Sequence, residues 1–213
     1  MTNAFVIFSY IYYNGLGDLM VGYPNKKGSY SALGTTSYSH RGMSLENDLN
    51  DTNRYYLDTD RAAVYKKPTP ISIVTVDYKS RATAKITEAY FGVPSTTDYN
   101  GVYRSRYIDF EAKETHSKTS MALNMIHPHQ LEHLRRVIRY GGIAFLIVRF
   151  SAYEETYFID AGKMLKYIET STAKSIKYSW FKENGVLIPY NYSIKVDYLR
   201  VIDTIIDGGN YDE

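Results

Sequence analysis

Three residues in the middle of the chain have the types and the spacing of a metal-dependent nuclease centre. A single residue separates Glu111 from Lys113, so on a β-strand both side chains project from the same face. Asp98 lies upstream, at the end of a turn-rich stretch, and supplies a second carboxylate. Two carboxylates can hold a hydrated Mg²⁺ that meets a phosphate, and a lysine can stabilise charge on the phosphoryl oxygens. The pattern predicts phosphodiester hydrolysis, although by itself it also arises by chance.

Asp109 shares the strand face of Glu111 and Lys113. Two interpretations of this acid stay open. It can belong to the surroundings of the metal, or it can pair with Arg106 at the edge of a hairpin.

Three histidines offer a different kind of metal site. His129 and His133 are one helical turn apart, and His127 lies close by in the sequence. No further soft ligand accompanies them, and Mg²⁺ prefers oxygen ligands. Solvated or phosphate-facing histidines are therefore favoured over a zinc site.

The composition is that of a soluble globular domain. The chain has 213 residues, of which 44% are hydrophobic and 23% are charged. It contains no cysteine, which excludes disulfides and thiolate metal sites and fits a cytoplasmic location. The net charge of +2 is too small to indicate nucleic-acid binding.

The distribution of charge is more informative than the total. Between positions 61 and 85, six basic residues accompany a single acid, Asp77. Apolar-rich runs at 71–76 and 82–91, joined by a polar turn at 77–81, predict a β-hairpin in this region. A basic hairpin in a nearly neutral protein favours DNA binding over a merely solvated strand face. The basic residues are Arg61, Lys66, Lys67, Lys79, Arg81 and Lys85.

The amino-terminal region predicts no membrane segment. Residues 1–19 carry no Lys or Arg and no signal-peptide cleavage pattern, and their apolar run is too short to span a bilayer. Met20 offers an alternative start of translation, which would place residues 1–19 upstream of the true start. Residues 21–42 lack apolar periodicity, so we expect 1–42 to form a flexible arm.

The remaining segments predict one mixed α/β domain over residues 43–213. Ser44 is a good N-cap for a helix to about Leu57, and Pro128 suits the first turn of a helix that Gly141 ends. The run Ile143–Phe150 is almost continuously apolar, as in a strand buried on both faces. Further strands are expected at 62–67, 102–103, 107–114 and 156–160, and further helices at 163–170, 178–184 and 198–206.

Together these segments resemble the RecU family of Holliday junction resolvases, in the PD-(D/E)xK nuclease superfamily. The resemblance runs from about Tyr23 to Ile206 and is most specific between Pro94 and Thr115. It implies a restriction-endonuclease-like mixed sheet flanked by helices, with a protruding basic hairpin, the stalk, at about residues 66–91. The matching stretches are Arg41–Glu46, Lys66–Pro70, Glu88–Phe91, Pro94–Tyr103, Tyr107–Thr115 and His127–Gln130.

The resemblance also implies an activity and its site residues. The family members are homodimeric, Mg²⁺-dependent endonucleases that cut four-way DNA junctions in recombination and repair, and they modulate the recombinase RecA; Mn²⁺ is expected to substitute. Lys113 would stabilise the transition state, and Glu46 matches an accessory acid. Gln130 is either a metal ligand or simply a first-turn helix residue. The implied metal ligands are Thr96, Asp98, Glu111 and Gln130, and the implied DNA contacts are Arg41, Lys66, Lys67, Lys79, Arg81 and Lys85.

Two rival functions remain at this point. One is a non-catalytic junction-binding protein that modulates RecA, which the intact Asp98, Glu111 and Lys113 disfavour. The other is a restriction-type duplex nuclease, which needs base-reading elements in the major groove that the sequence does not make evident.

Overall fold

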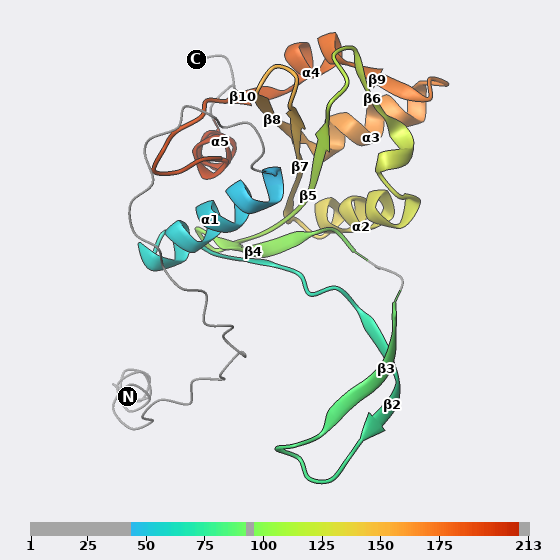
Figure 1. Cartoon of the computed structure of the whole chain (residues 1–213). Helices are drawn as coiled ribbons and strands as arrows, with labels where there is room; N and C mark the ends of the chain where they lie inside the picture. The colour runs from blue at the N-terminus through green and yellow to red at the C-terminus, as the bar shows by residue number, and fades with distance from the viewer. Residues whose placement is uncertain (1–43, 93–95, 209–213) are drawn as a thin grey trace, which may run out of the picture. The chain divides into compact units, whose positions relative to one another are not determined.

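The fold is taken from a computed structural model, which describes residues 44–92 and 96–208 (Figure 1). The expected amino-terminal arm, including Arg41, lies outside the described residues. No helix in the described part of the chain has the length and apolar character needed to cross a membrane.

A six-stranded mixed sheet forms the centre of the domain (Figure 1). Its strand order is β1-β4-β5-β7-β8-β10, and only β5 and β7 pair in parallel. A parallel pair needs a crossover connection, and here the crossover carries helix α2 across the sheet. The strands are β1 (Ala63–Lys66), β4 (Tyr99–Tyr103), β5 (Arg106–Thr115), β7 (Ile143–Phe150), β8 (Glu155–Asp160) and β10 (Val186–Ile188).

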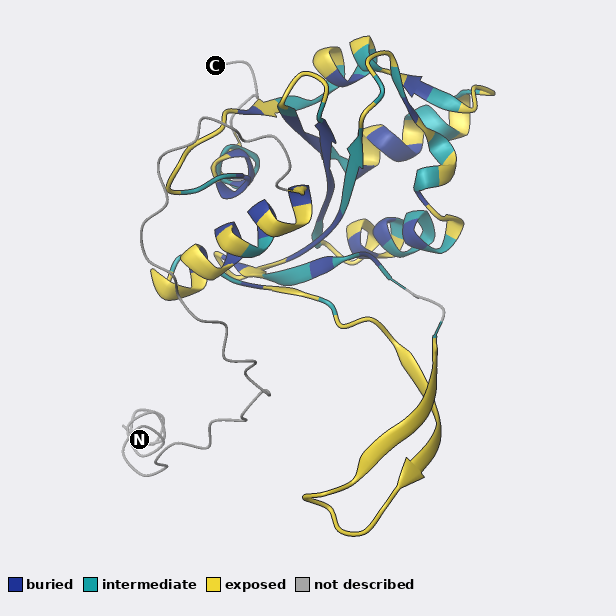
Figure 2. Ribbon diagram, in the orientation of Figure 1, coloured by how far each residue is buried: buried dark blue, intermediate teal, exposed yellow. Residues whose placement is uncertain are grey.

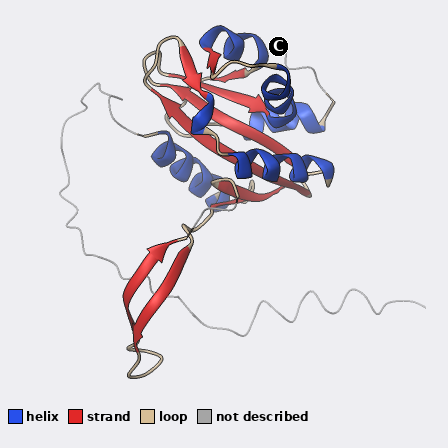
Figure 3. Cartoon of the chain, turned by 90° about the vertical axis from the view of Figure 1, so that its right-hand side faces the viewer, coloured by secondary structure: helices blue, strands red, loops and turns tan. Residues whose placement is uncertain are grey.

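Helices cover both faces of this sheet (Figure 3). α1 and α5 pack on one face, and α2, α3 and α4 on the other. A short strand pair, β6 with β9, and the 3₁₀ turn η1 lie beside the second group. The bounds are α1 (Leu45–Asp58), α2 (Pro128–Arg139), α3 (Ala161–Thr170), α4 (Tyr178–Asn184), α5 (Leu199–Ile206), β6 (Ser120–Ala122), β9 (Ser175–Lys177) and η1 (Leu123–Met125).

Period-two alternation on the central strands divides the core into two layers. On β7, Phe145 and Ile147 pack with α1 and α5, whereas Leu146 and Val148 pack with α2, α3 and α4. On β5, Phe110 belongs to the first layer. Its odd-numbered neighbours at 109, 111 and 113 therefore face the second layer, where α2 lies.

The predicted helix ends and the predicted mixed sheet flanked by helices are confirmed. The Ser44 hydroxyl accepts the Asn47 N–H at 3.4 Å at the start of α1, and Leu49 on that helix is fully buried. α2 begins at Pro128, and Gly141, with φ +80°, follows its end. The mixed sheet flanked by helices is the arrangement that the resemblance implied.

The stalk is shorter than expected. β2 (Ile71–Asp77) pairs only with β3 (Lys85–Phe91), and every residue of both strands is exposed (Figure 2). Seven residues per strand span roughly 23 Å at 3.3 Å each, not the ~40 Å that pairing along 66–91 would give. Lys66 instead pairs with Tyr99 in the central sheet. Pro68 and Pro70 separate the two ladders because proline has no N–H to donate.

Gly101 allows the edge strand β1 to lie close to β4. A Cβ atom at this position would lie 2.2 Å from the Ala63 carbonyl oxygen and 2.7 Å from the Val64 Cα. Both neighbours are backbone atoms, so a side chain here must displace β1.

We therefore expect Gly101→Ala to lower the free energy of unfolding by about 2–3 kcal/mol, as overpacking does. Urea denaturation followed by circular dichroism measures the change. The control is Gly162→Ala on α3, where alanine favours the helix and the effect should stay within about 1 kcal/mol. Equal stability of Gly101→Ala and the wild type would contradict the close approach of β1.

Candidate active site

Asp98 and Glu111 meet where β4 begins beside β5. The pairing of Tyr99 with Phe110 sets the two strands in register. The Asp98 N–H donates to Glu111 Oε2 at 3.1 Å, and the Ala112 N–H donates to Asp98 Oδ2 at 3.2 Å. The structure thus brings together the two acids that the sequence placed on separate segments.

Glu111 is completely buried. Its Oε1 atom accepts hydrogen bonds from Lys113 Nζ at 2.5 Å and Gln130 Nε2 at 2.7 Å. Burial, with the nearby Asp98, raises the pKa of Glu111 to about 8, although Lys113 opposes the shift. Burial and the neighbouring acid thus disfavour the charged form of this carboxyl more than Lys113 favours it.

The Gln130 side chain has two partners. Its Oε1 accepts the His127 N–H at 2.9 Å and closes a capping box at the start of α2, while its Nε2 donates to Glu111. Gln130 is thus a first-turn helix residue that also reaches the acid pair. In this arrangement its NH₂ group, not its oxygen, faces Glu111.

A cleft of about 490 Å³ lies beside Asp98, between the start of α1 and the segment after β1; Glu111 is not among its lining residues. Thr96 and Asp98 line it. Glu46 and Lys66 also line it and form an ion pair at 2.5 Å. The accessory acid predicted on α1 therefore lies at this cleft, beside a lysine expected on the stalk.

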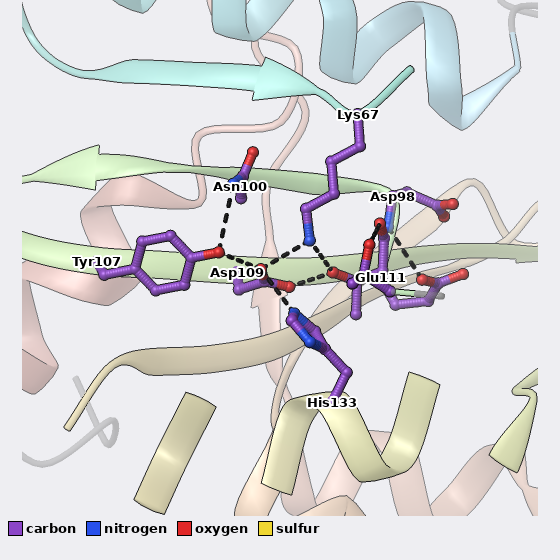
Figure 4. Close-up of polar contacts among 9 residues, drawn as sticks. Lys67, Asp98, Asn100, Tyr107, Asp109, Glu111 and His133 are labelled. Atoms are coloured by element: carbon purple, nitrogen blue, oxygen red, sulfur yellow. Dashed lines mark hydrogen bonds and ion pairs between the residues drawn. The ribbon is translucent and has the colours of Figure 1, made fainter. Parts of the chain in front are cut away.

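Asp109 lies on the same face of β5 and is also fully buried. Figure 4 shows Lys67, Tyr107 and His133 converging on it, at 2.8, 2.6 and 3.0 Å. The Thr97 hydroxyl donates to its other oxygen. Among the described residues these are its side-chain partners, so of the two interpretations left open for Asp109 the pairing with Arg106 is wrong.

The histidines do not assemble a zinc site. Within residues 44–92 and 96–208, no three His, Cys, Asp or Glu side chains are arranged to hold a metal ion. The rings of His127 and His129 stack with centroids 5.4 Å apart, and His133 bonds to Asp109. The candidate donors at the acid pair are two carboxylates, an amide and a hydroxyl, an oxygen-rich set that suits a hard cation.

The remaining basic residues of the stalk lie apart from the acids in the fold. Lys79, Arg81 and Lys85 are exposed, and they form no ion pair with any residue that the structure describes. Lys67, by contrast, directs its ammonium to Asp109 and is not part of the paired hairpin.

Sequence reasoning missed several residues that shape the site. The sequence did not predict that Thr97 and Tyr107 donate to Asp109. The one available signal for a polar cluster was the position of Asp109 on the same strand face as Glu111. Glu114 accepts the Leu45 N–H at 2.8 Å and so ties the start of α1 to β5. That contact joins positions far apart in the chain and leaves no local signal.

Comparisons with known proteins identify the family of the chain. The family model described as Recombination protein U (RecU) matches residues 40–204. The Holliday junction resolvase RecU of Bacillus cereus (strain G9842) is 47% identical over 197 residues, covering 88% of this chain and 98% of its own. That of Oceanobacillus iheyensis is 50% identical over 171 residues, covering 79% and 87%.

Among solved structures, Archaeoglobus fulgidus Hjc, a Holliday junction resolvase from an archaeal hyperthermophile, has a TM-score of 0.40 and 12% identity. The match covers 65% of this chain and 93% of that chain. The family model spans most of the chain, and the two relatives are identical to the chain at about half of the aligned positions. The chain belongs to the RecU family.

Proposed function

We propose that this protein is an endonuclease that resolves four-way (Holliday) DNA junctions by paired symmetric nicks, in homologous recombination and DNA repair. The observation that carries the proposal is the pairing of the partly buried Asp98 with the fully buried Glu111, with Lys113 beside them, in a chain of the RecU family. The relatives compared above are named as Holliday junction resolvases.

The acid pair fits a divalent cation. Glu111 has a raised pKa because it is buried next to Asp98, and a bound cation would favour its ionised form. Asp98 and Glu111 would hold the ion, with Thr96 as a further oxygen ligand; Mg²⁺ is the expected ion and Mn²⁺ a substitute. Gln130 would join them only after its side-chain amide turns to present the oxygen that here accepts the His127 N–H. When bound, the ion supplies charge stabilisation at the scissile phosphate and an activated water.

The other site residues have separable roles. Lys113, already directed at Glu111, stabilises negative charge on the reacting phosphoryl group. Glu46 lies across the cleft as the accessory acid, and Lys66 beside it is available to a phosphate once its ion pair opens.

The stalk reads the junction. Its exposed Lys79, Arg81 and Lys85 present positive charge away from the acid pair, where they can meet phosphates of converging arms. Lys66 adds a contact at the cleft, and Arg41 is a further proposed phosphate contact. The expected role of Lys67 in DNA binding is reconsidered below.

The assembly, partners and location rest on the family resemblance. Two symmetric nicks call for two active sites related by a two-fold axis, so the active species is a homodimer. The proposed location is the cytoplasm. A stable monomer in sedimentation that still makes paired nicks would contradict this. RecA is the proposed protein partner, which co-sedimentation with RecA filaments can test.

The first prediction separates cleavage from binding. Asp98→Asn and Glu111→Gln should abolish Mg²⁺-dependent cleavage, since each removes a charged ligand, while junction affinity without metal stays close to wild type because phosphate contacts dominate it. Lys113→Ala should also lose turnover but keep metal binding. The assay compares a labelled four-way junction with linear duplex of the same sequence.

Near-wild-type cleavage by either acid variant would contradict the site. Junction binding by the wild-type protein with no cleavage in Mg²⁺ or Mn²⁺ would favour the alternative, a non-catalytic modulator of RecA.

The second prediction concerns pH. Because the pKa of Glu111 is about 8, cation binding below that pH must release a proton, so affinity should fall about tenfold per pH unit between 8 and 6. Titration calorimetry in buffers of different ionisation enthalpy measures both the affinity and the proton release.

Stability should follow the same group in the metal-free protein. The pKa of Glu111 in the folded state lies above its ordinary value of 4.5. The contribution of this one group to the free energy of unfolding is therefore greatest at low pH and is lost as pH rises from about 5 to 8. Glu111→Gln should remove this slope and the proton release together. A wild-type cation affinity that does not change between pH 6 and 8 would contradict the assignment.

The third prediction tests the stalk. Replacing Lys79 and Arg81 with alanine should weaken junction binding and lower the slope of log affinity against log salt by about one unit per lost phosphate contact. Residual cleavage should remain metal-dependent, since the acid pair is separate. If the double variant discriminates junction from duplex as well as the wild type does, the junction reader lies elsewhere.

A further inference from the structure

Asp109 is a fully buried carboxylate with no role in the chemistry proposed above. Its four side-chain partners come from four separate segments: Lys67 follows β1, Thr97 precedes β4, Tyr107 lies on β5, and His133 lies on α2 (Figure 4). Burying a charge costs several kcal/mol unless the geometry of its partners compensates. Here Lys67, Tyr107 and His133 bond to Oδ2, and the Thr97 hydroxyl donates to Oδ1.

Two of these partners hold Asp98 directly. Thr97 precedes Asp98 in the chain, is buried, and donates its hydroxyl proton to Asp109 while accepting from Lys67 Nζ at 2.8 Å. The backbone N–H of Lys67 in turn donates to the Asp98 carbonyl oxygen at 2.8 Å. The cluster therefore restrains the backbone of Asp98 in two ways: through the preceding residue, Thr97, and through the hydrogen bond from the Lys67 N–H.

These restraints act just before the hydrogen-bonded pairing of β4 begins. β4 starts at Tyr99, so Asp98 lies one residue before the strand. Its side-chain orientation depends on the backbone around it, because its Oδ2 must reach the Ala112 N–H and its own N–H must reach Glu111. A shift of Thr97 would disturb both contacts.

We propose that Asp109 is a positioning residue: through Thr97 and Lys67 it fixes the Asp98 carboxylate beside Glu111 for cation binding. Lys67 then acts within this cluster and is not a DNA contact. The inference rests on the proposed function of the acid pair.

The decisive variant is Thr97→Val, which keeps the shape of the side chain and removes the hydroxyl that ties the residue before Asp98 to both Asp109 and Lys67. Loss of an outer partner of a metal ligand typically costs ~10–100-fold in metal affinity or activity. We expect Mn²⁺ affinity in calorimetry to fall by about tenfold or more, and single-turnover junction cleavage to fall at low metal and recover partly at high metal. Thr97→Ser restores a hydroxyl and should recover most of the wild-type affinity.

Thr156→Val is the matched control. Thr156 is as buried as Thr97 and also serves a buried ion pair, accepting from Arg149, which bonds to Asp48 at 2.7 Å. It lies on β8, away from the acid pair, so this variant should lose stability with unchanged Mn²⁺ affinity. Asp109→Asn is a second variant, which should lower the affinity as Thr97→Val does and which covers the case that Thr97→Val does not fold.

The outcomes separate the two levels of the proposal. Folded Thr97→Val and Asp109→Asn with wild-type Mn²⁺ affinity and wild-type cleavage would overturn the positioning role and leave the nuclease intact. An equal loss of affinity in Thr156→Val would also overturn it, because the effect would then be general destabilisation. A wild-type protein that binds Mn²⁺ without cutting junctions would instead refute the proposed function, while the titrations still decide the positioning role.

Discussion

The burial of two carboxylates on one face of one central strand is the constraint on which this structure depends. Asp109 and Glu111 are both fully buried on β5, where an unpaired charge would cost several kcal/mol. The fold treats them differently. Donors from four segments surround Asp109, including an ammonium. Glu111 also accepts from an ammonium, that of Lys113, but it lies beside a second acid, Asp98, which together with burial raises its pKa. The proximity of a second carboxylate is what distinguishes Glu111 from Asp109 and what makes it suited to a divalent cation under the proposed function.

This asymmetry organises the elements around the sheet. The parallel pairing of β5 with β7 requires a crossover, and that crossover places Gln130 and His133 of α2 over the acid-bearing face. On the opposite side, Glu114 fixes the start of α1, which carries Glu46 to the cleft. The stalk depends on none of this packing, since its residues are exposed and its strands pair only with each other. The proposed chemistry and the proposed DNA recognition are thus assigned to separate parts of the domain.

Local patterns predicted what local physics controls. The capping by Ser44, the αL glycine after α2 and the apolar run of β7 each follow from a few adjacent residues, and all are found. The acids were identified because period-two spacing puts Glu111 and Lys113 on one face. The three-residue strands β6, β9 and β10 are too short to show a period, and the stalk was overestimated because pairing was extended through two prolines. The contact of Lys67 with Asp109 could not be predicted from the sequence, because nothing in the neighbouring residues distinguishes a lysine that binds a buried acid from one that binds a phosphate.

The central claim is that Asp98 and Glu111 hold a divalent cation, and Mn²⁺ tests it most directly because its anomalous scattering locates the ion itself. Crystals of the wild-type protein soaked in Mn²⁺ at pH 8 should show an anomalous difference peak in contact with both carboxylates, at about 2.0–2.6 Å from their oxygens. The same soak of Glu111→Gln should show no peak there. A wild-type site without a peak, or a peak bound only by other residues, would contradict the account.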